Sequence, residues 1–393
     1  MFEYASEGGT PSTANKSFYA NEIPFVKIED TNQKYILKTN SYISELGLNN
    51  SSAWLIPKNN IIFTTGATIG NVSINKILTA TKQGIVGAII KKTFDLEYVY
   101  YLLSSNTFQE KVHLNSSTGT FSSLALSAFL NLPVVILSNR FEQEKIGRLF
   151  YTLDKIVSLY ERKMSLLEKL EKSLIFNIFT KKNEGKPSIR FFGFKEDWQS
   201  WKLENKGFLY SGLTSKSKED FANGNSKYIS YLNVYSNFNT DLKDKSSVFI
   251  KPDDKQNTIE KGDILFTMSS ETYQEVGLSS VVTEEVNEKI YLNSFCFGYR
   301  LNETNFLFPN FASFLFRNDA VRNEIIFQSN GGTSRFNLSK KSFLNIKIKT
   351  PQIEEQQKIS SLLDTLHITH AQLKRKLNLI KNIQKSLLNK MFV

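Results

Sequence analysis

Three histidines and a single cysteine are the residues of this sequence that could most directly serve as metal ligands or nucleophiles. His367 and His370 are one helical turn apart and could form half of a metal site, whereas His113 stands alone. Only Asp364 is near enough in sequence to join the pair, which favours two ordinary residues on a helix face. Cys296 lies in the apolar run SFCFGY, which predicts a core residue rather than a reactive thiol. We therefore expect no metal site and no cysteine nucleophile.

The motifs of enzymes that methylate DNA, cleave it or hydrolyse nucleotides are also missing. An adenine-N6 methyltransferase needs an Asn/Asp-Pro-Pro-aromatic turn and a glycine-rich cofactor loop, and neither occurs. A P-loop needs Ser or Thr after Gly-Lys, but Gly185-Lys186 is followed by Pro187. Pro252-Asp253 could begin a PD…E-x-K nuclease motif, yet no Glu-x-Lys follows within the next forty residues. We expect no catalytic residue and no cofactor in this chain.

Three groups of polar and basic side chains recur in the two halves of the chain. Such side chains contact phosphates and base edges of DNA, and neighbouring glycines allow close approach of the backbone. Solvated turns are the alternative for any single residue, but recurrence in both halves favours a DNA-binding surface. The first-half candidates are Thr10, Ser12, Thr13 and Lys16; Thr64, Thr65 and Thr68; and Ser116, Ser117, Thr118, Gly119 and Thr120. The second-half candidates are Thr214, Ser215, Lys216 and Lys218; Ser269, Ser270 and Tyr273; and Asn330, Gly331, Gly332, Thr333, Ser334 and Arg335.

The net charge of +11 and the pI near 9.3 make an acidic partner plausible, with nucleic acid first. The excess is concentrated in residues 142–186 and 355–393, which carry +3 and +5. Residues 1–141 and 187–354 carry only +2 and +1. Counterion release supplies most of the non-specific affinity for DNA, so these two nearly neutral segments should bind bare DNA weakly. We therefore expect tight binding to need a partner protein.

The two basic segments are copies of each other. Residues 142–179 align without gaps on residues 355–392 at a constant offset of 213, with 14 of 38 pairs identical. Weaker similarity continues upstream, between residues 117–134 and 330–348. A repeat of this length indicates two half-proteins in tandem, each a variable domain followed by a shared segment.

Each shared segment has apolar residues at spacings of three and four, which predicts one long amphipathic helix of roughly 57 Å at 1.5 Å per residue. Such a stripe cannot be buried in one small core, so we expect the copies to pair as an antiparallel coiled coil. Unrelated helices or a dimerisation coil are the alternatives.

The second copy carries a one-sign run, that is, a series of basic residues with no acidic residue among them. It suggests an anionic neighbour, which could be glutamates of the first copy, DNA or a partner protein. Solvated side chains are the alternative. The run comprises Lys374, Arg375, Lys376, Lys381, Lys385 and Lys390.

The variable domains contain strand signals with short helical patches between them, so the predicted fold class is α+β with pseudo-twofold symmetry. The strand signals include residues 23–28, 60–74, 84–90, 227–234, 262–270 and 277–282, and the helical patches include 96–105 and 311–319. The predicted divisions are a first domain at 1–141, a central helix at 142–186, a second domain at 187–354 and a C-terminal helix at 355–393.

Several segments, in order and repeated, resemble the specificity subunit of type I restriction–modification systems. They are GGTPST (8–13), IPFVKIED (23–30), IIFTTGATIGNV (61–72), GTFSSLALSAFLNLPV (119–134), IRFFGFKEDWQSWKLEN (189–205), GTSRFNLSKKSFLNIKI (332–348) and TPQIEEQQKI (350–359). The resemblance implies two target recognition domains that each read half of a split DNA sequence, with the family's two conserved helices setting the spacing.

The same resemblance implies methyltransferase and restriction subunits as partners, which would supply S-adenosylmethionine, ATP and Mg. Two departures stand out. Leu137-Ser138-Asn139 replaces the Thr350-Pro351-Gln352 that opens the second helix, and the first domain lacks the lead-in that precedes Gly207. The rival hypotheses are a coiled-coil adaptor with protein-binding heads and a stand-alone methyltransferase or nuclease.

A cytoplasmic location is expected. The chain has one cysteine and so forms no internal disulfide, its N-terminus does not resemble a signal peptide, and no apolar stretch approaches the roughly 20 residues of a membrane helix.

Overall fold

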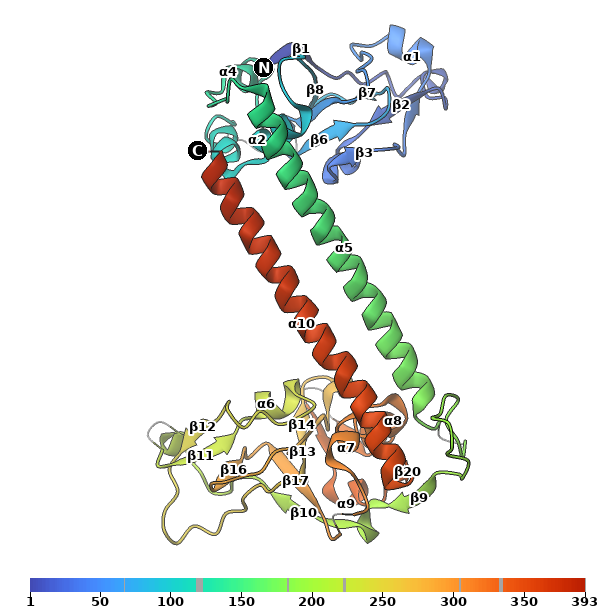
Figure 1. Ribbon diagram of the computed structural model, residues 1–393, viewed down its shortest axis with the longest axis vertical. Coiled ribbons are helices and arrows are strands. Elements are labelled where there is room, and N and C mark those ends of the chain that lie inside the picture. Colours follow the sequence, from blue (N-terminus) through green and yellow to red (C-terminus); the bar gives the residue numbers. More distant parts are fainter. Residues whose placement is uncertain are drawn as a thin grey trace. The chain divides into compact units, whose positions relative to one another are not determined.

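The computed structural model describes residues 1–66, 68–117, 123–181, 184–221, 224–303, 305–331 and 335–392. Its contacts divide the chain into two compact units, and each unit contains part of both long helices (Figure 1). Unit 1 comprises Met1–Lys163 and Leu373–Val393, and unit 2 comprises Met164–Gln372. Among the described residues, no helix combines the length and the apolarity that are needed to cross a membrane.

Unit 1 is built on two sheets. The larger has the strand order β1-β8-β5-β6-β3, in which the first four strands are antiparallel neighbours and β3 is parallel to β6. The smaller has the order β4-β2-β7, with β2 antiparallel to β4 and parallel to β7. The strands are β1 Phe2–Glu7, β2 Ile23–Val26, β3 Tyr35–Ile36, β4 Tyr42–Ile43, β5 Asn60–Thr64, β6 Val72–Asn75, β7 Ala80–Thr81 and β8 Ile85–Ile90. The helices are α1 Glu45–Asn49, α2 Leu96–Ser104, α3 Asn106–Leu114, α4 Leu126–Asn131 and the long α5 Arg140–Ile178.

Unit 2 repeats both sheets and adds two more. Its larger sheet is β10-β17-β13-β15, all antiparallel, and its smaller one is β12-β11-β16 with the same mixed pairing as in unit 1. The additions are β14-β19-β18 and β20-β9. The strands are β9 Gln199–Lys202, β10 Gly207–Ser211, β11 Ser226–Ile229, β12 Ser246–Val248, β13 Ile264–Thr267, β14 Ser269–Ser270, β15 Ser279–Val281, β16 Ile290–Leu292, β17 Cys296–Leu301, β18 Ser329–Gly331, β19 Phe336–Leu338 and β20 Lys347–Thr350. The helices are α6 Tyr231–Ser236, α7 Pro309–Leu315, α8 Asp319–Phe327, α9 Lys340–Phe343 and the long α10 Ile353–Met391.

The predicted internal repeat is confirmed by the matching order of strands and helices in the two halves. The sheet β1-β8-β5-β6 corresponds to β10-β17-β13-β15, and β4-β2-β7 corresponds to β12-β11-β16. Helices α5 and α10 have 39 residues each, and both of their ends differ by the offset of 213 found in the sequence. The departure at Leu137-Ser138-Asn139 therefore does not displace the start of α5.

Equivalent residues of the two long helices enter the two cores. In unit 1, Ile146 and Phe150 of α5 pack with α2, the sheet and Phe392. In unit 2, Ile359 and Leu363 of α10 pack with α7, the sheet and Phe179. Each of these residues lies 213 positions from its counterpart. Each domain core therefore contains the start of the long helix from its own half of the chain and the end of the long helix from the other half.

The long helices run antiparallel in both units. In unit 1, Asp154 Oδ1 accepts from Gln384 Nε2 at 2.6 Å, and Glu161 lies 2.7 Å from Lys381. In unit 2, Glu168 lies 3.2 Å from His370, and Glu171 lies 3.8 Å from His367. Positions that rise along α5 thus pair with positions that fall along α10, as predicted.

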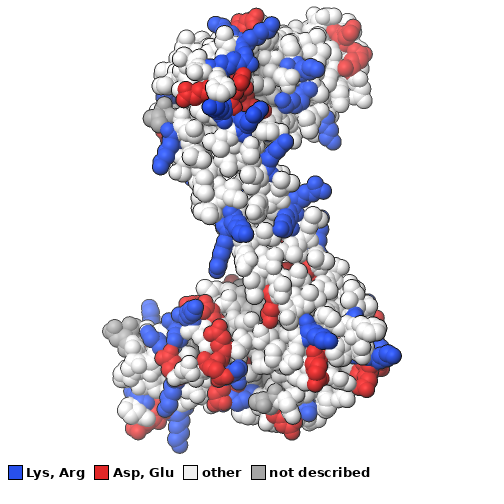
Figure 2. Space-filling view, in the orientation of Figure 1, with Lys and Arg blue, Asp and Glu red and all other residues white. Residues whose placement is uncertain are grey.

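The one-sign run on α10 is mostly solvated. Lys381 pairs with Glu161, which is one of the neighbours the sequence suggested, and both side chains are about half exposed. Figure 2 shows Lys and Arg side chains projecting from the helical segments. Exposed pairs of this kind contribute little stability, so the run remains available to an anionic partner.

The strand prediction at residues 227–234 is wrong in its second half. Strand β11 ends at Ile229, and Ser230 then caps α6 by accepting a hydrogen bond from Asn233 N at 3.1 Å. A serine side chain can accept a hydrogen bond from the backbone N–H three residues ahead, and this favours the start of a helix over continuation of the strand. The other predicted strands and helical patches overlap strands β2, β5, β6, β8, β13, β14 and β15 and helices α2 and α7.

A buried glutamine joins each domain to its long helix. Gln143 Oε1 accepts from Asp95 N at 2.9 Å, and its Nε2 donates to Leu137 O at 2.7 Å. Gln356, its repeat counterpart, accepts from Phe308 N at 2.9 Å and donates to Pro351 O at 2.9 Å. Asp95 and Phe308 are the N-cap residues of α2 and α7, so the same side chain orients the corresponding helix in both halves.

Candidate nucleic-acid interface

In unit 1, the second polar group meets the segment that follows the third group at the end of β5. Thr65 N and Gly66 N both donate to Gly84 O, at 2.9 and 3.0 Å, and Leu124 N donates to Thr65 O at 2.8 Å. Gly84 has a φ of +83°, which its lack of a side chain permits. A Cβ on Gly66 would lie 3.3 Å from Gly84 Cα, so the two backbones approach closely. The turn after β5, the turn before β8 and the segment before α4 therefore form one edge.

The first polar group reaches the same edge. Gly8 N donates to Ile85 O and Gly9 N to Thr81 O, at 2.9 and 3.1 Å. Thr10 Oγ1 accepts from Gln83 N at 3.3 Å. The first and second predicted groups of the first half, and Leu124 close after the third, are thus gathered around residues 81–85, which the sequence analysis did not select. A polar Lys-Gln-Gly turn directly before an apolar strand was the signal for them.

The members of these groups differ in exposure. The exposed ones are Thr10, Ser12, Thr13, Lys16, Thr68 and Ser117, and Ser116 is half-buried. Thr64 is fully buried and its hydroxyl bonds Thr68 O and Asn71 N, while Thr65 is 4% exposed. We assign Thr64 and Thr65 a supporting role rather than a contacting one. Thr118, Gly119 and Thr120 lie outside the described residues.

Unit 2 assembles its corresponding edge by the same backbone contacts. Gly212 N donates to Cys296 O and Leu213 N to Leu292 O, at 3.2 and 2.8 Å, as Gly8 and Gly9 do around residues 81–85. Met268 N donates to Phe295 O at 2.8 Å. Residues 292–296 therefore take the place of residues 81–85.

The small sheet β14-β19-β18 joins the second and third polar groups of unit 2. Ser269 and Asn330 both pair with Asn337 of β19, and Ser270 and Gly331 both pair with Phe336. The ring of Tyr273 packs edge-on against Phe336 with centroids 5.4 Å apart. Asn330, Gly331 and Arg335 are exposed, whereas Ser270 is 8% exposed. Gly332, Thr333 and Ser334 lie outside the described residues.

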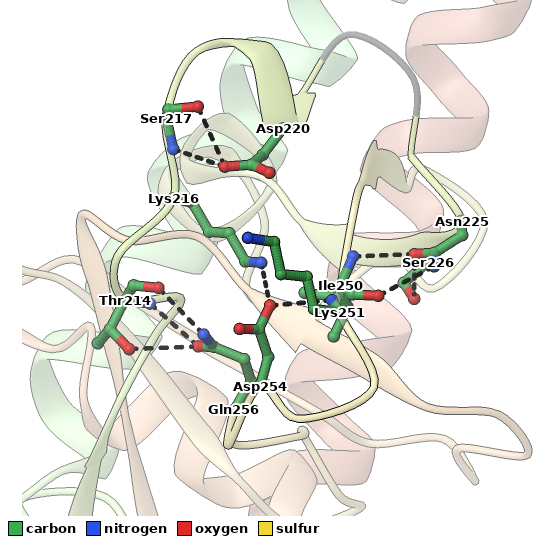
Figure 3. Close-up of polar contacts among 10 residues, drawn as sticks. All are labelled: Thr214, Lys216, Ser217, Asp220, Asn225, Ser226, Ile250, Lys251, Asp254 and Gln256. Atoms are coloured by element: carbon green, nitrogen blue, oxygen red, sulfur yellow. Dashed lines mark hydrogen bonds and ion pairs between the residues drawn. The ribbon is translucent and has the colours of Figure 1, made fainter.

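The first polar group of unit 2 is tied to a second loop (Figure 3). Thr214 N donates to Gln256 Oε1 at 3.0 Å, and Gln256 Nε2 donates back to Thr214 O at 3.0 Å. Lys216 forms an ion pair with Asp254, whose pKa is lowered mainly by the hydrogen bond from Lys216.

Only 4% of the Lys216 side chain is exposed, so its charge is already compensated within the loop pair. Ser215, in the left-handed region at a φ of +55°, and Lys218 are exposed beside it. These two residues are therefore better placed than Lys216 to contact a phosphate.

Of the residues first considered as metal ligands or nucleophiles, two histidines lie next to glutamates and the cysteine lies in the core. His367 and His370 face glutamates of α5, and no group of three His, Cys, Asp or Glu residues in the described part of the chain could hold a metal ion. Cys296 is 1% exposed at the start of β17, and burial raises the pKa of its thiol. A thiol held in its neutral form is a poor nucleophile.

The family model for the type I restriction modification DNA specificity domain matches residues 1–169 and 195–382. The chain is 25% identical over 396 residues to the type I restriction enzyme MjaIX specificity subunit of Methanocaldococcus jannaschii, an alignment covering 98% of this chain and 89% of that protein. It is 30% identical over 160 residues to the type I restriction enzyme HindI specificity subunit of Haemophilus influenzae, covering 40% of this chain and 33% of that protein.

Two solved structures share the fold. The type I restriction-modification S subunit from M. genitalium matches with a TM-score of 0.55 and 16% identity, covering 100% of this chain and 98% of that one. The HsdS subunit from Thermoanaerobacter tengcongensis matches with a TM-score of 0.52 and 17% identity, covering 98% and 93%. At these identities the likeness concerns the fold alone.

Proposed function

The chain belongs to the family of type I restriction–modification DNA specificity domains, and from this premise we propose that it is the sequence-reading subunit of a type I restriction–modification complex. Residues 1–141 and 187–354 act as two target recognition domains, each reading one half of a split duplex sequence. Residues 142–186 and 355–393 form the helical spacer that separates the two half-sites.

The recurrence of one polar edge on one framework is the observation that carries this proposal. Both halves use the same backbone contacts to bring three polar segments together, around residues 81–85 and around residues 292–296. The side chains at the two edges differ, with threonines at 64–68 and Ser269, Ser270 and Tyr273 in the second half. Like frameworks with unlike side chains suit a protein that reads two different half-sites, because base edges are distinguished by donor and acceptor pattern.

We further propose that this chain directs chemistry that its partners perform. The modification partner provides S-adenosylmethionine and the methyl transfer, and the restriction partner provides ATP and Mg. Apolar side chains exposed on α5 support a protein partner along the spacer, because their spacing of seven and four residues places them on one helix face, and a partner that covers them removes apolar surface from water. They are Leu159 in unit 1 and Leu166 and Leu170 in unit 2, at 64%, 56% and 55% exposed.

Methylome sequencing of the host with and without this gene tests the proposal. The expected result is the loss of methylation at one split sequence motif in the deletion strain and its return on complementation. A methylome that is identical in both strains, while the partner genes are expressed, contradicts it. Binding by the assembled complex should also weaken steeply with salt while keeping its preference for that motif.

A further inference from the structure

A cavity of about 360 Å³ opens in unit 2 between α6, β14 and the short turn Tyr273–Glu275. Its lining includes Tyr231, Tyr235, Ser270, Glu271, Glu275 and Arg335. Ser270 and Arg335 belong to the polar groups that we propose contact DNA. The cavity is thus part of the candidate interface, but it contains carboxylates, which sequence reasoning had not selected.

The carboxylate of Glu275 is held in one orientation. Tyr235 OH donates to Oε1 at 2.6 Å, and Ser270 Oγ lies 3.4 Å from Oε2. The hydrogen bond from Tyr235 is the main cause of a lowered pKa of Glu275, so the group is ionised at neutral pH. A carboxylate offers about four acceptor positions. Glu275 therefore keeps acceptor capacity for a donor that enters the cavity.

Two arginines, of which Arg322 is buried and Arg317 is half-buried, hold the segments that carry this group. Arg317 donates to Val234 O and Tyr235 O, at 3.0 and 2.9 Å, and Arg322 donates to Gln274 O and Val276 O, at 2.8 and 2.9 Å. Burial lowers the pKa of each guanidinium to about 10, which leaves both charged at neutral pH. The backbone that carries Tyr235 and the backbone that carries Glu275 are therefore each held in place by an arginine.

An ionised carboxylate on a DNA-facing surface restricts what it can contact. Phosphates repel it, and so do the carbonyl and ring-nitrogen acceptors on base edges. The duplex groups that attract it in the major groove are the amino groups of cytosine N4 and adenine N6. The corresponding turn of the first domain, residues 64–71, contains no acidic residue, so Glu275 has no counterpart in that turn.

We propose that the cavity lined by Tyr235, Ser270 and Glu275 reads an exocyclic amino group in the second half of the target, with Glu275 as the acceptor. The base is a cytosine or an adenine. Tyr235 and Ser270 orient the acceptor, and Arg317 and Arg322 are positioning residues that do not contact the DNA. This inference rests on the proposed function.

The test uses the full chain assembled with its methyltransferase partner and a duplex that carries the motif found by methylome sequencing. Each cytosine of the second half-site is replaced in turn by 2-pyrimidinone, and each adenine that is not itself methylated by purine, since these analogues lack only the amino group. For the unaltered complex, one replacement should weaken binding roughly 10-fold or more. Glu275→Gln should weaken binding to the natural duplex by a similar factor. Binding by this variant should no longer depend on whether that one amino group is present. Tyr235→Phe should have a smaller effect at the same base.

Glu284→Gln is the matched control, because Glu284 is an exposed carboxylate of the same domain outside the cavity. It should leave target binding unchanged. If Glu275 only repels DNA, Glu275→Gln will tighten binding to target and random duplexes alike, and the inference is overturned. It is also overturned if no amino-group replacement in that half-site matters to the unaltered complex. A complex that does not distinguish its motif from random DNA at all would instead contradict the proposed function.

Discussion

At the scale of single residues, the side chains that matter most are those that satisfy backbone groups between elements. Gln143 and Gln356 are 0% and 1% exposed, and each joins the start of a domain helix to the segment before a long helix. An amide can do this because it presents a donor and an acceptor at once. Their equivalence shows that the repeat preserves a hydrogen-bonding role as well as an apolar pattern.

Replacing Gln356 by alanine should lower the free energy of unfolding by about 1–3 kcal/mol, because Phe308 N and Pro351 O would be left buried without their partner. Urea denaturation followed by circular dichroism measures the effect. The neighbouring Gln357 is exposed, so Gln357→Ala serves as the control and should change stability by less than about 0.5 kcal/mol. Equal effects of the two substitutions would show that the bridge contributes nothing.

At the scale of elements, the long helices are stabilised by one apolar face each. On α10, Leu373 and Leu377 are both 7% exposed, whereas Leu379 is 59% exposed. One face of α10 is therefore buried at these positions, and another is exposed.

Leu377→Asp should destabilise unit 1 by about 3 kcal/mol or more, since it removes a buried leucine and places a charge at the helix contact. Leu379→Asp introduces the same charge two residues away on the exposed face and should leave the melting temperature nearly unchanged. Thermal melts of the two variants side by side provide the measurement. Similar melting temperatures would contradict the antiparallel packing in unit 1.

Gly147 illustrates a conflict between helix propensity and packing. Alanine is favoured over glycine inside a helix by about 1 kcal/mol. A Cβ at position 147, however, would lie 2.5 Å from Asp95 Oδ1 and 2.9 Å from Tyr98 N, at the cap of α2. We expect packing to dominate, so Gly147→Ala should destabilise the protein by about 1–2 kcal/mol. Ser158→Ala on the exposed side of α5 is the control, and a stabilising Gly147→Ala would disprove the close contact.

At the scale of the whole molecule, two domains on related frameworks should read DNA independently. Exchanging residues 1–141 for the matching domain of a relative should alter one half of the methylated motif and leave the other half and the spacing unchanged. The reason is that the framework contacts of each polar edge lie within one unit. Methylome sequencing of the exchanged strain is the measurement, and a change in both half-sites would refute independent reading.

The repeat, the two long helices and their antiparallel pairing could all be predicted from the sequence. These features depend on apolar spacing and on self-similarity, both of which can be counted along the chain without knowledge of the contacts. The offset of 213 found in the sequence is the one that relates the ends of α5 and α10.

Which polar residues form the candidate interface depends on the tertiary structure. It added Glu275, which no motif marks, and it placed the polar turn at Gln83 beside Thr10, because contacts between elements bring together segments that are far apart in the sequence. In the fold, Thr64 is buried and the charge of Lys216 is paired with that of Asp254. Exposure and charge partners depend on contacts that are distant along the chain, so residue type and loop position could indicate the polar segments but not the side chains available to DNA.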